Sequence, residues 1–364
     1  MKKKLVSLIL ATSMVAAMLV GCGGTTAPVE EAAAPKTEEA APKTEEAAPQ
    51  TEEEVQEEAV ETVEPVTLNL AYMPNYGSLW SIENAIAQGF LEEEGITVNL
   101  TEFADGPTII AAMEGGSIDL GYIGQGAHKL CINGQATIFA LSHISNGDMV
   151  IGGPDVASIE DLAGKKVAYC SGTSSESILI STLAKAGMTM DDIQAVDMDP
   201  TGIVSAMVSG GVDAAATWSP NSLKILEEVE GATELADNMT FADETVSLAS
   251  WIVMPEFAEA NQDVLVRFTR ALFKAMDYAA VDNQEATAEL VAARCALDKD
   301  SVYEQRGDAE WLTGAQVSAG AADGTVEGYY ELQKQAFIEA GAVEGDPAVA
   351  DYVMLDVMIE AGEY

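Results

Sequence analysis

The chain has 364 residues, with 60 Asp or Glu against 17 Lys or Arg, and its formal net charge at pH 7 is −43. This acidity argues against nucleic acid and anionic lipid as partners, because both carry negative charge. After Cys22, only Cys131, Cys170 and Cys295 remain, without the spacing of a metal site or a disulfide framework. We therefore expect no metal, no cofactor and no nucleic acid, and interpret these three cysteines as small buried residues.

The first residues have the pattern of an exported lipoprotein. Lys2 to Lys4 precede an apolar run over 5–20, which is too short to span a membrane comfortably. The sequence Leu19-Val20-Gly21-Cys22 resembles a bacterial lipobox, in which the cysteine carries the lipid and becomes the first mature residue. We predict a lipoprotein signal peptide over 1–22 with the lipid on Cys22. The alternative is an ordinary signal peptide in which this cysteine is incidental.

Residues 23–65 predict a linker. Glu-Glu-Ala-Ala-Pro-Lys-Thr recurs there with slight variation, and thirteen glutamates over 24–65 face only Lys36 and Lys43. Acid, alanine and recurrent proline cannot bury a core, and like charges repel, so an extended tether is expected.

The remaining residues, 66–364, exceed the usual size of one core and fit two lobes. One motif occurs twice, at 109–119 and at 203–213, with matching residues 94 positions apart. Each copy has apolar residues at helical spacing, a glycine pair, an aspartate and then a short apolar strand. The repeat predicts two α/β lobes with a ligand cleft between them, where loops leave the carboxyl ends of parallel strands. The alternative is that this motif is simply a common connection in α/β proteins.

The first predicted elements are a strand over 66–72, a helix capped by Ser78 or Ser81 and ending at Gln88, and a strand over 96–103. Asn75 and Tyr76 lie in the loop after the first strand and are candidate ligand contacts. The alternative is a turn residue followed by a half-buried aromatic.

A strand over 120–123 follows the first repeated helix. Gly124, Gln125 and Gly126 then begin a helix that contains His128 and Lys129. Glycines at this position allow a ligand to approach backbone amides, where the helix dipole favours an anion. A strand over 137–144 comes next, and we place the first crossing between the lobes at 149–151.

In the second lobe, a strand over 165–170 runs into a glycine- and hydroxyl-rich turn and a helix. The amides and hydroxyls of Thr173, Ser174 and Ser175 form the best predicted seat for an anion in the chain. The alternative is a helix that caps itself and binds nothing. Glu176 would repel an anion bound at this turn, so it either points away or meets an ammonium group on the same ligand; we favour the second.

The next predicted elements are a strand over 193–196, a helix capped by Asp199 or Thr201, and a strand over 213–217. Trp218 follows the last of these strands and is a candidate wall of the cleft. As a core tryptophan it would be equally ordinary. The strand over 247–254 returns the chain to the first lobe, and helices are predicted over 261–282, 285–296 and 328–340. Residues 66–150 and 250–364 thus form lobe 1, and 151–249 form lobe 2. Trp311 could also close the cleft.

Five segments occur in the same order as in a known family. They cover residues 103–107, 115–124, 161–168, 172–175 and 211–220. They resemble the nitrate/sulfonate/taurine-type substrate-binding proteins of ABC transporters, over roughly residues 66–300. The resemblance implies the α/β fold of type II periplasmic binding proteins, in which two three-layer lobes are joined by a two-crossover hinge.

The same resemblance implies a monomer outside the cytoplasm, anchored to the membrane by lipid, that delivers a small solute to a permease and its ATPase. Carried over by position, the ligand loops fall on Asn75 and Tyr76, Gly124 to Gly126, Thr173 to Glu176, and Trp218. Sulfonate-binding members usually have histidine where this chain has Glu176, which favours an amino-bearing ligand such as taurine over a simple alkanesulfonate.

Three other ligands stay open within this family: a thiamine-pyrimidine precursor, nitrate and bicarbonate. A pyrimidine-synthesising enzyme is the remote alternative. It would need a reactive histidine or lysine and a cysteine-rich motif in the cleft, whereas His128 and His143 are the only histidines and no cysteine cluster exists. We therefore expect a binding protein without catalytic residues.

Overall fold

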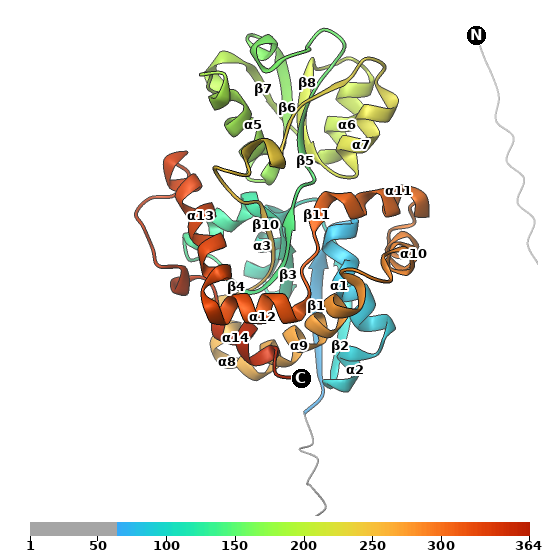
Figure 1. Ribbon diagram of the computed structural model, residues 1–364, viewed down its shortest axis with the longest axis vertical. Coiled ribbons are helices and arrows are strands. Elements are labelled where there is room, and N and C mark those ends of the chain that lie inside the picture. Colours follow the sequence, from blue (N-terminus) through green and yellow to red (C-terminus); the bar gives the residue numbers. More distant parts are fainter. Residues whose placement is uncertain (1–63) are drawn as a thin grey trace, which may run out of the picture. The chain divides into compact units, whose positions relative to one another are not determined.

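The computed structural model describes residues 64–364, which belong to one compact unit (Figure 1). The predicted signal peptide with Cys22, and the linker up to residue 63, lie outside the described residues. No helix within 64–364 has both the length and the apolar character that crossing a membrane requires.

Two sheets organise the described residues. The first has the order β11-β4-β10-β3-β1-β2, and the second has the order β7-β6-β8-β5-β9. The strands of the first sheet are β1 (Val66–Tyr72), β2 (Ile96–Glu102), β3 (Leu120–Ile123), β4 (Thr137–Ser145), β10 (Leu248–Val253) and β11 (Ala309–Glu310). Those of the second are β5 (Asp148–Gly152), β6 (Lys166–Tyr169), β7 (Gln194–Asp197), β8 (Ala214–Trp218) and β9 (Thr233–Asp237).

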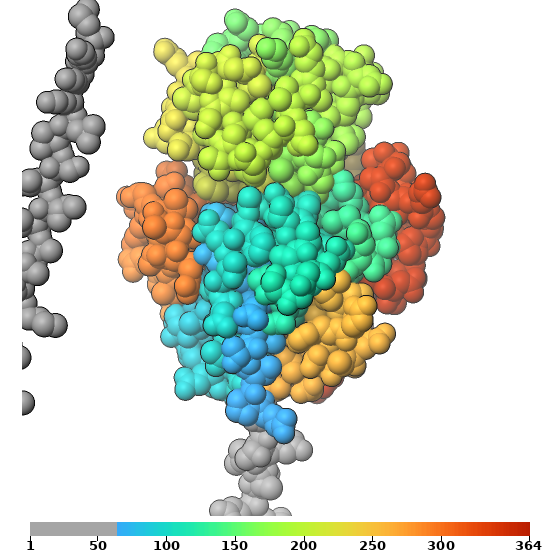
Figure 2. Space-filling view, turned by 180° about the vertical axis from the view of Figure 1, so that it is seen from behind, coloured from blue at the N-terminus to red at the C-terminus, as the bar shows by residue number. Residues whose placement is uncertain are grey.

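Helices fill the intervals between strands and most of the chain after β10. They are α1 (Tyr76–Ala87), α2 (Phe90–Glu93), α3 (Gly106–Glu114), α4 (His128–Ile132), α5 (Ser174–Lys185), α6 (Pro200–Val208), α7 (Asn221–Glu228), α8 (Pro255–Ala260), α9 (Gln262–Ala279), α10 (Gln284–Cys295), α11 (Lys299–Glu304), α12 (Gly314–Asp323), α13 (Thr325–Glu339) and α14 (Leu355–Ala361). The helices after β10 pack with the first sheet, so their residues, orange to red in Figure 2, share the core of the first lobe.

The second lobe has three layers because its strands are apolar on both faces. Successive residues of a strand point to opposite faces. Ala214 and Ala216 of β8 accordingly join the core under α5, whereas Ala215 joins the core under α6 and α7. Small residues on the central strand let helices approach from both sides.

The repeated motif has the same role in both lobes. Gly116 and Gly210 end α3 and α6 with positive φ values of 72° and 67°, a conformation that glycine adopts without strain. The aspartate of each copy then binds a backbone amide on the neighbouring parallel strand. Asp119 accepts from Asn69 at 2.7 Å, and Asp213 accepts from Lys166 at 2.8 Å. The repeat therefore aligns strands, and its aspartates do not reach the ligand side of either sheet.

The chain crosses between lobes earlier than the sequence analysis expects. All five residues of β5 pair with β8, and Met149 to Gly152 also pair with β9, so β5 belongs wholly to the second sheet. A crossing at 149–151 is therefore wrong, and the chain crosses at residues 146–147. The return strand β10 pairs with β3 and β4 from Leu248 onward, two residues before the predicted resumption of lobe 1. We therefore propose lobe boundaries at 146–147 and 246–247.

Candidate functional site

A cavity of about 80 Å³ lies between the two lobes. One water requires about 10–15 Å³ on this measure, so the cavity accommodates a solute of several non-hydrogen atoms. First-lobe residues around it are Met73, Asn75, Gly77, Gly106, Pro107, Tyr122, Gly124, Gln125, Ala127, His143, Ser145, Ser247, Ala249, Gln305, Asp308 and Trp311. Those from the second side of the crossing are Gly147, Asp148, Thr173, Ser174, Trp218 and Ser219.

Two structurally equivalent helix starts face the cavity from opposite lobes. Asn75 caps α1 by accepting from the Ser78 amide at 2.8 Å, so the predicted cap at Ser78 or Ser81 is wrong. The Ser78 hydroxyl instead accepts from the amide of Met73, five residues earlier, at 3.0 Å. In the second lobe, the Ser175 hydroxyl accepts from Cys170, also five residues earlier and also at 3.0 Å.

Thr173 caps α5 by accepting from the Ser175 amide at 3.2 Å. Gly106 and Pro107 at the start of α3 line the same cavity. Helix starts concentrate unpaired amides and the positive end of the dipole, so these three helices together favour an anionic group inside.

Two carboxyl groups lie in the same cavity, and no lysine or arginine lines it. Asp148, at the start of β5, is 2% exposed and accepts from Asn238 at 3.0 Å and from Ser247 at 3.2 Å. Burial raises its pKa, against the lowering effect of hydrogen bonds from Ser174, Asn238 and Ser247. The carboxyl group of Asp148 thus accepts hydrogen bonds only from neutral donors.

Asp308 approaches from the segment between α11 and β11. Burial and the charge of Asp148 raise the pKa of Asp308 to about 7, although the hydrogen bond with Ser219 lowers it. The cavity therefore pairs positively polarised helix starts with two acidic groups, an arrangement complementary to a solute with charges of both signs.

Trp311 and His143 line the cavity on the first-lobe side, and Tyr76 and Trp80 pack against Trp311 from behind. The ring centroid of Trp311 lies 5.0 Å from that of Tyr76, 5.0 Å from that of Trp80 and 4.8 Å from that of His143. Burial lowers the pKa of His143 to about 3, so its ring is neutral at physiological pH. Trp311, a candidate for closing the cleft, lines the cavity.

Six of the ten predicted ligand residues line the cavity: Asn75, Gly124, Gln125, Thr173, Ser174 and Trp218. The other four, Tyr76, Gly126, Ser175 and Glu176, do not line it. Tyr76 is 1% exposed and packs against Trp311, and its amide donates to Gln305 at 2.9 Å. Ser175 is fully buried, where its hydroxyl donates to the Ala216 carbonyl at 2.7 Å.

Gly126 serves the contact between lobes. A Cβ atom on it would lie 1.9 Å from the carbonyl carbon of Thr173, so only glycine lets the two backbones meet. This contact closes one side of the cavity with main chain.

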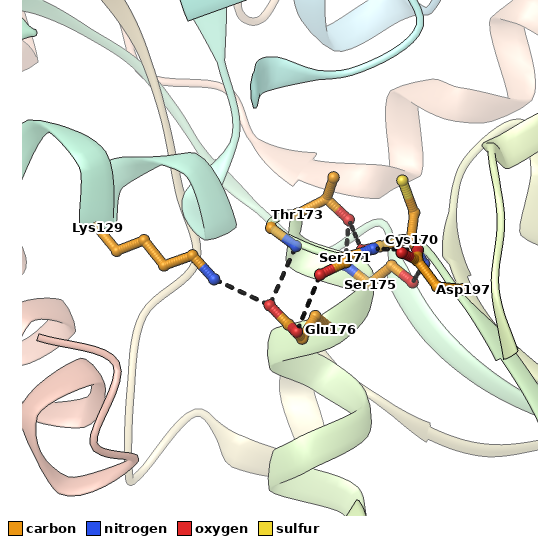
Figure 3. A network of polar contacts seen from close by, with 8 residues as sticks. Lys129, Cys170, Ser171, Thr173, Ser175, Glu176 and Asp197 are labelled. Carbon is orange, nitrogen blue, oxygen red and sulfur yellow. Dashed lines mark hydrogen bonds and ion pairs between the residues drawn. The ribbon is translucent and has the colours of Figure 1, made fainter. Parts of the chain in front are cut away.

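Glu176 does not line the cavity, and its carboxylate binds Lys129 of the other lobe (Figure 3). Its carboxylate accepts from Lys129 Nζ at 2.9 Å and from the Gly172 amide at 3.0 Å. Burial alone would raise the pKa of Glu176, but these hydrogen bonds and the charge of Lys129 outweigh burial and lower it. In this structure the carboxylate is therefore bound by Lys129 and the Gly172 amide, and the meeting of Glu176 with a ligand ammonium stays a prediction.

Five residues that line the cavity are not among the predicted ligand contacts: Asp148, Asp308, His143, Tyr122 and Gln305. Asp148 and Asp308 are 160 positions apart and belong to no spaced motif, so only the folded chain brings them together. Within 64–364, no three His, Cys, Asp or Glu side chains gather in a way that could hold a metal ion.

Comparisons with known sequences give one family. The family described as "NMT1/THI5 like" matches residues 81–286. A Brucella abortus protein named as a "putative binding protein" is 30% identical over 298 residues, which cover 82% of this chain and 93% of that protein. The taurine-binding periplasmic protein of Escherichia coli is 24% identical over 189 residues, which cover 51% of this chain and 58% of that protein.

Solved structures share the fold. The alkanesulfonate-binding protein SsuA from Xanthomonas axonopodis, bound to MOPS, has a TM-score of 0.61 and 21% identity, over 80% of this chain and 99% of that one. The desulfurization enzyme DSZB has a TM-score of 0.59 and 15% identity, over 81% of this chain and 98% of that one. At these identities the likeness concerns the fold alone, so an enzyme and a binding protein can both share it.

The expected α/β fold and the resemblance to the nitrate/sulfonate/taurine-binding proteins are thus confirmed. The chain has the two-lobed fold of periplasmic binding proteins, and it belongs to the NMT1/THI5-like family.

Proposed function

We propose that this protein is the solute-binding component of an ABC importer, and that it captures a small zwitterion of the taurine or aminosulfonate type. The observation that carries the proposal is the cavity between the lobes, to which α1 and α3 of one lobe and α5 of the other present their N-termini. The acid of the solute meets these helix starts, where each charge-assisted hydrogen bond contributes about 1.5–3 kcal/mol at best.

Contacts from both lobes explain how capture is signalled. A solute held by Asn75 on one side and Ser174 on the other favours the state in which the lobes touch. The permease then recognises that state, because a solute shifts an equilibrium only towards the state that it binds better. Of the predicted contacts, we retain the six that line the cavity and assign closure to Gly126 and Glu176.

The protein acts outside the cytoplasm as a monomer, held at the membrane by a lipid on Cys22. Names of relatives support this location, since the Escherichia coli relative is a periplasmic protein. Replacement Cys22→Ser tests the anchor: the variant should leave the membrane fraction, whereas retention there would contradict lipidation.

The role proposed is binding without catalysis. The titratable groups that line the cavity are the neutral His143, Tyr122 and the carboxyl groups of Asp148 and Asp308, and no cysteine or lysine is part of this lining. The relatives named as binding proteins support this view, although DSZB shows that the fold also serves an enzyme.

A thermal-shift panel on the full chain tests the function. The solutes are taurine, an alkanesulfonate, nitrate, bicarbonate, thiamine pyrimidine and common amino acids. A solute at 100 times its Kd should stabilise the folded chain by about 2.7 kcal/mol. A shift with taurine supports the proposal, a shift with the pyrimidine alone keeps the importer role but changes the solute, and silence across the panel contradicts the proposed class of solute.

A further inference from the structure

We infer that Asp148 and Asp308, brought together from opposite sides of the interlobe crossing, form a subsite for a protonated nitrogen of the solute. The inference rests on the proposed solute-binding function and specifies one end of the molecule that is bound. It assigns to these residues the role that the sequence analysis gave to Glu176.

The first support is the way the fold brings the two carboxyl groups together. β11 pairs with the end of β4, with Ala309 opposite Ser145, and the Asn146 amide donates to the Asp308 carbonyl. Asp308 packs closely against the crossing, because a Cβ atom added to Gly147 would lie 3.1 Å from the Cβ atom of Asp308. Gly147 is followed directly by Asp148, and both carboxyl residues line the cavity.

The second support is that this pair has no cationic partner among the described residues. Asp148 is bound by Asn238 and Ser247, and Asp308 by Ser219, all of which are neutral. The nearest basic residue in sequence, Arg306, lies with its guanidinium 4.0 Å from the ring centroid of Tyr303 and donates to the carbonyl of Tyr303. Buried carboxylates are costly unless they are paired, so a cation in the cavity would supply the missing partner.

The third support is the presence of two tryptophans in the lining of the same cavity. Trp218 and Trp311 line the same cavity from different lobes. Aromatic faces attract cations and shield them from water. Burial first, and then the charge of Asp148, raise the pKa of Asp308, and one proton or one bound cation would relieve the repulsion between the two carboxyl groups.

The test compares three probes at pH 8, where Asp308 is ionised: taurine, 2-hydroxyethanesulfonate and ethylamine. The first two differ only in an ammonium against a hydroxyl group, and ethylamine carries the nitrogen without the acid. Isothermal titration calorimetry on the full chain should show that taurine binds at least about tenfold more tightly than its hydroxyl analogue. Ethylamine should bind weakly but measurably.

Asp308→Asn keeps the shape of the side chain and removes its charge. It should weaken taurine about 10- to 100-fold, abolish the response to ethylamine and leave the hydroxyl analogue within about threefold. Glu310→Gln is the matched control, because Glu310 is exposed, lies two residues away and does not line the cavity. Its affinities should equal those of the parent chain.

Three results would overturn the inference: equal affinity of the parent chain for taurine and its hydroxyl analogue, unchanged taurine binding by Asp308→Asn, or no response to either amine. The first comparison uses only the parent chain, so it stands even if the variant folds poorly. Binding of the hydroxyl analogue or nitrate without the amines would overturn this subsite and leave the solute-binding function intact. If none of the solutes binds, both the subsite and the proposed class of solute are contradicted.

Discussion

Replacement Glu176→Gln separates a closure contact from a ligand contact. Both side chains of the Lys129–Glu176 pair are about one-fifth exposed, at 21% and 20%, and their charged atoms are 2.9 Å apart. Exposed ion pairs contribute about 0.2–1 kcal/mol, whereas removing one partner of a buried pair costs about 3–5 kcal/mol. Glutamine can still accept a hydrogen bond from the Gly172 amide, so we expect the closed state to lose about 1–2 kcal/mol, between the values for exposed and buried pairs.

This loss should weaken every solute equally, because Glu176 holds the two lobes together and does not line the cavity. Calorimetric titration with taurine and 2-hydroxyethanesulfonate should therefore show the same fall in affinity, of about 5- to 30-fold. A double-mutant cycle with Lys129→Met should show that most of the loss is shared between the two residues.

The exposed pair Lys224–Glu228, at 3.8 Å within α7, provides the control, and Glu228→Gln should leave both affinities unchanged. A fall in affinity for taurine alone would refute the reasoning. It would mean that Glu176 contacts the ammonium group of the ligand and that its ion pair with Lys129 does not determine affinity.

Three further predictions concern closure, stability and pH. Gly126→Ala should lower solute affinity more than tenfold in calorimetry with little change in melting temperature, since its methyl group would meet the Thr173 backbone of the other lobe. Ser175→Ala should lower the free energy of unfolding by about 1–3 kcal/mol in urea titration, because the Cys170 amide loses a buried acceptor. Asp308 has a pKa raised to about 7 in the folded chain, so its contribution to stability is full below about pH 4 and is lost as pH rises through 7. The stability difference between the parent chain and Asp308→Asn should therefore shift against the parent between pH 4 and 8.

Each of these has an outcome that would contradict it. Parent-like affinity in Gly126→Ala would mean that the lobes can meet elsewhere, and Ser205→Ala, on the exposed side of α6, is the stability control for Ser175→Ala. A stability difference independent of pH would mean that Asp308 titrates in the folded chain as it does in water.

The sequence predicted the parts of the fold that depend on local pattern. The motif that recurs 94 positions later predicted two lobes. The predicted strand over 120–123 matches β3 to the residue, because a glycine pair and an aspartate mark where the strand starts. The crossing was misplaced because Met149 to Ile151 forms an apolar run that fits either sheet. Its assignment depends on pairing with β8 and β9, which local sequence does not encode.

The site residues likewise fall into those that local sequence predicts and those that only the folded chain brings together. Residues at strand-to-helix turns, such as Asn75, Thr173 and Ser174, were found because cap residues after a strand mark the edge of a sheet. Asp148 and Asp308 were not, since their proximity comes from the pairing of β11 with β4 across a long stretch of sequence. Local sequence also does not predict which group Glu176 binds, because its partner Lys129 lies in the other lobe.

The paired aspartates of the repeat have a consequence for how this protein can change. Asp119 and Asp213 fix the alignment of their sheets at the amino ends of β3 and β8, whereas Gly124 and Trp218, which line the cavity, lie at or just beyond the carboxyl ends of the same strands. A four-residue strand separates the two ends by about 13 Å. Mutations that alter the choice of solute can therefore accumulate at one end without disturbing strand alignment at the other, so specificity and folding can be varied independently in each half of the molecule.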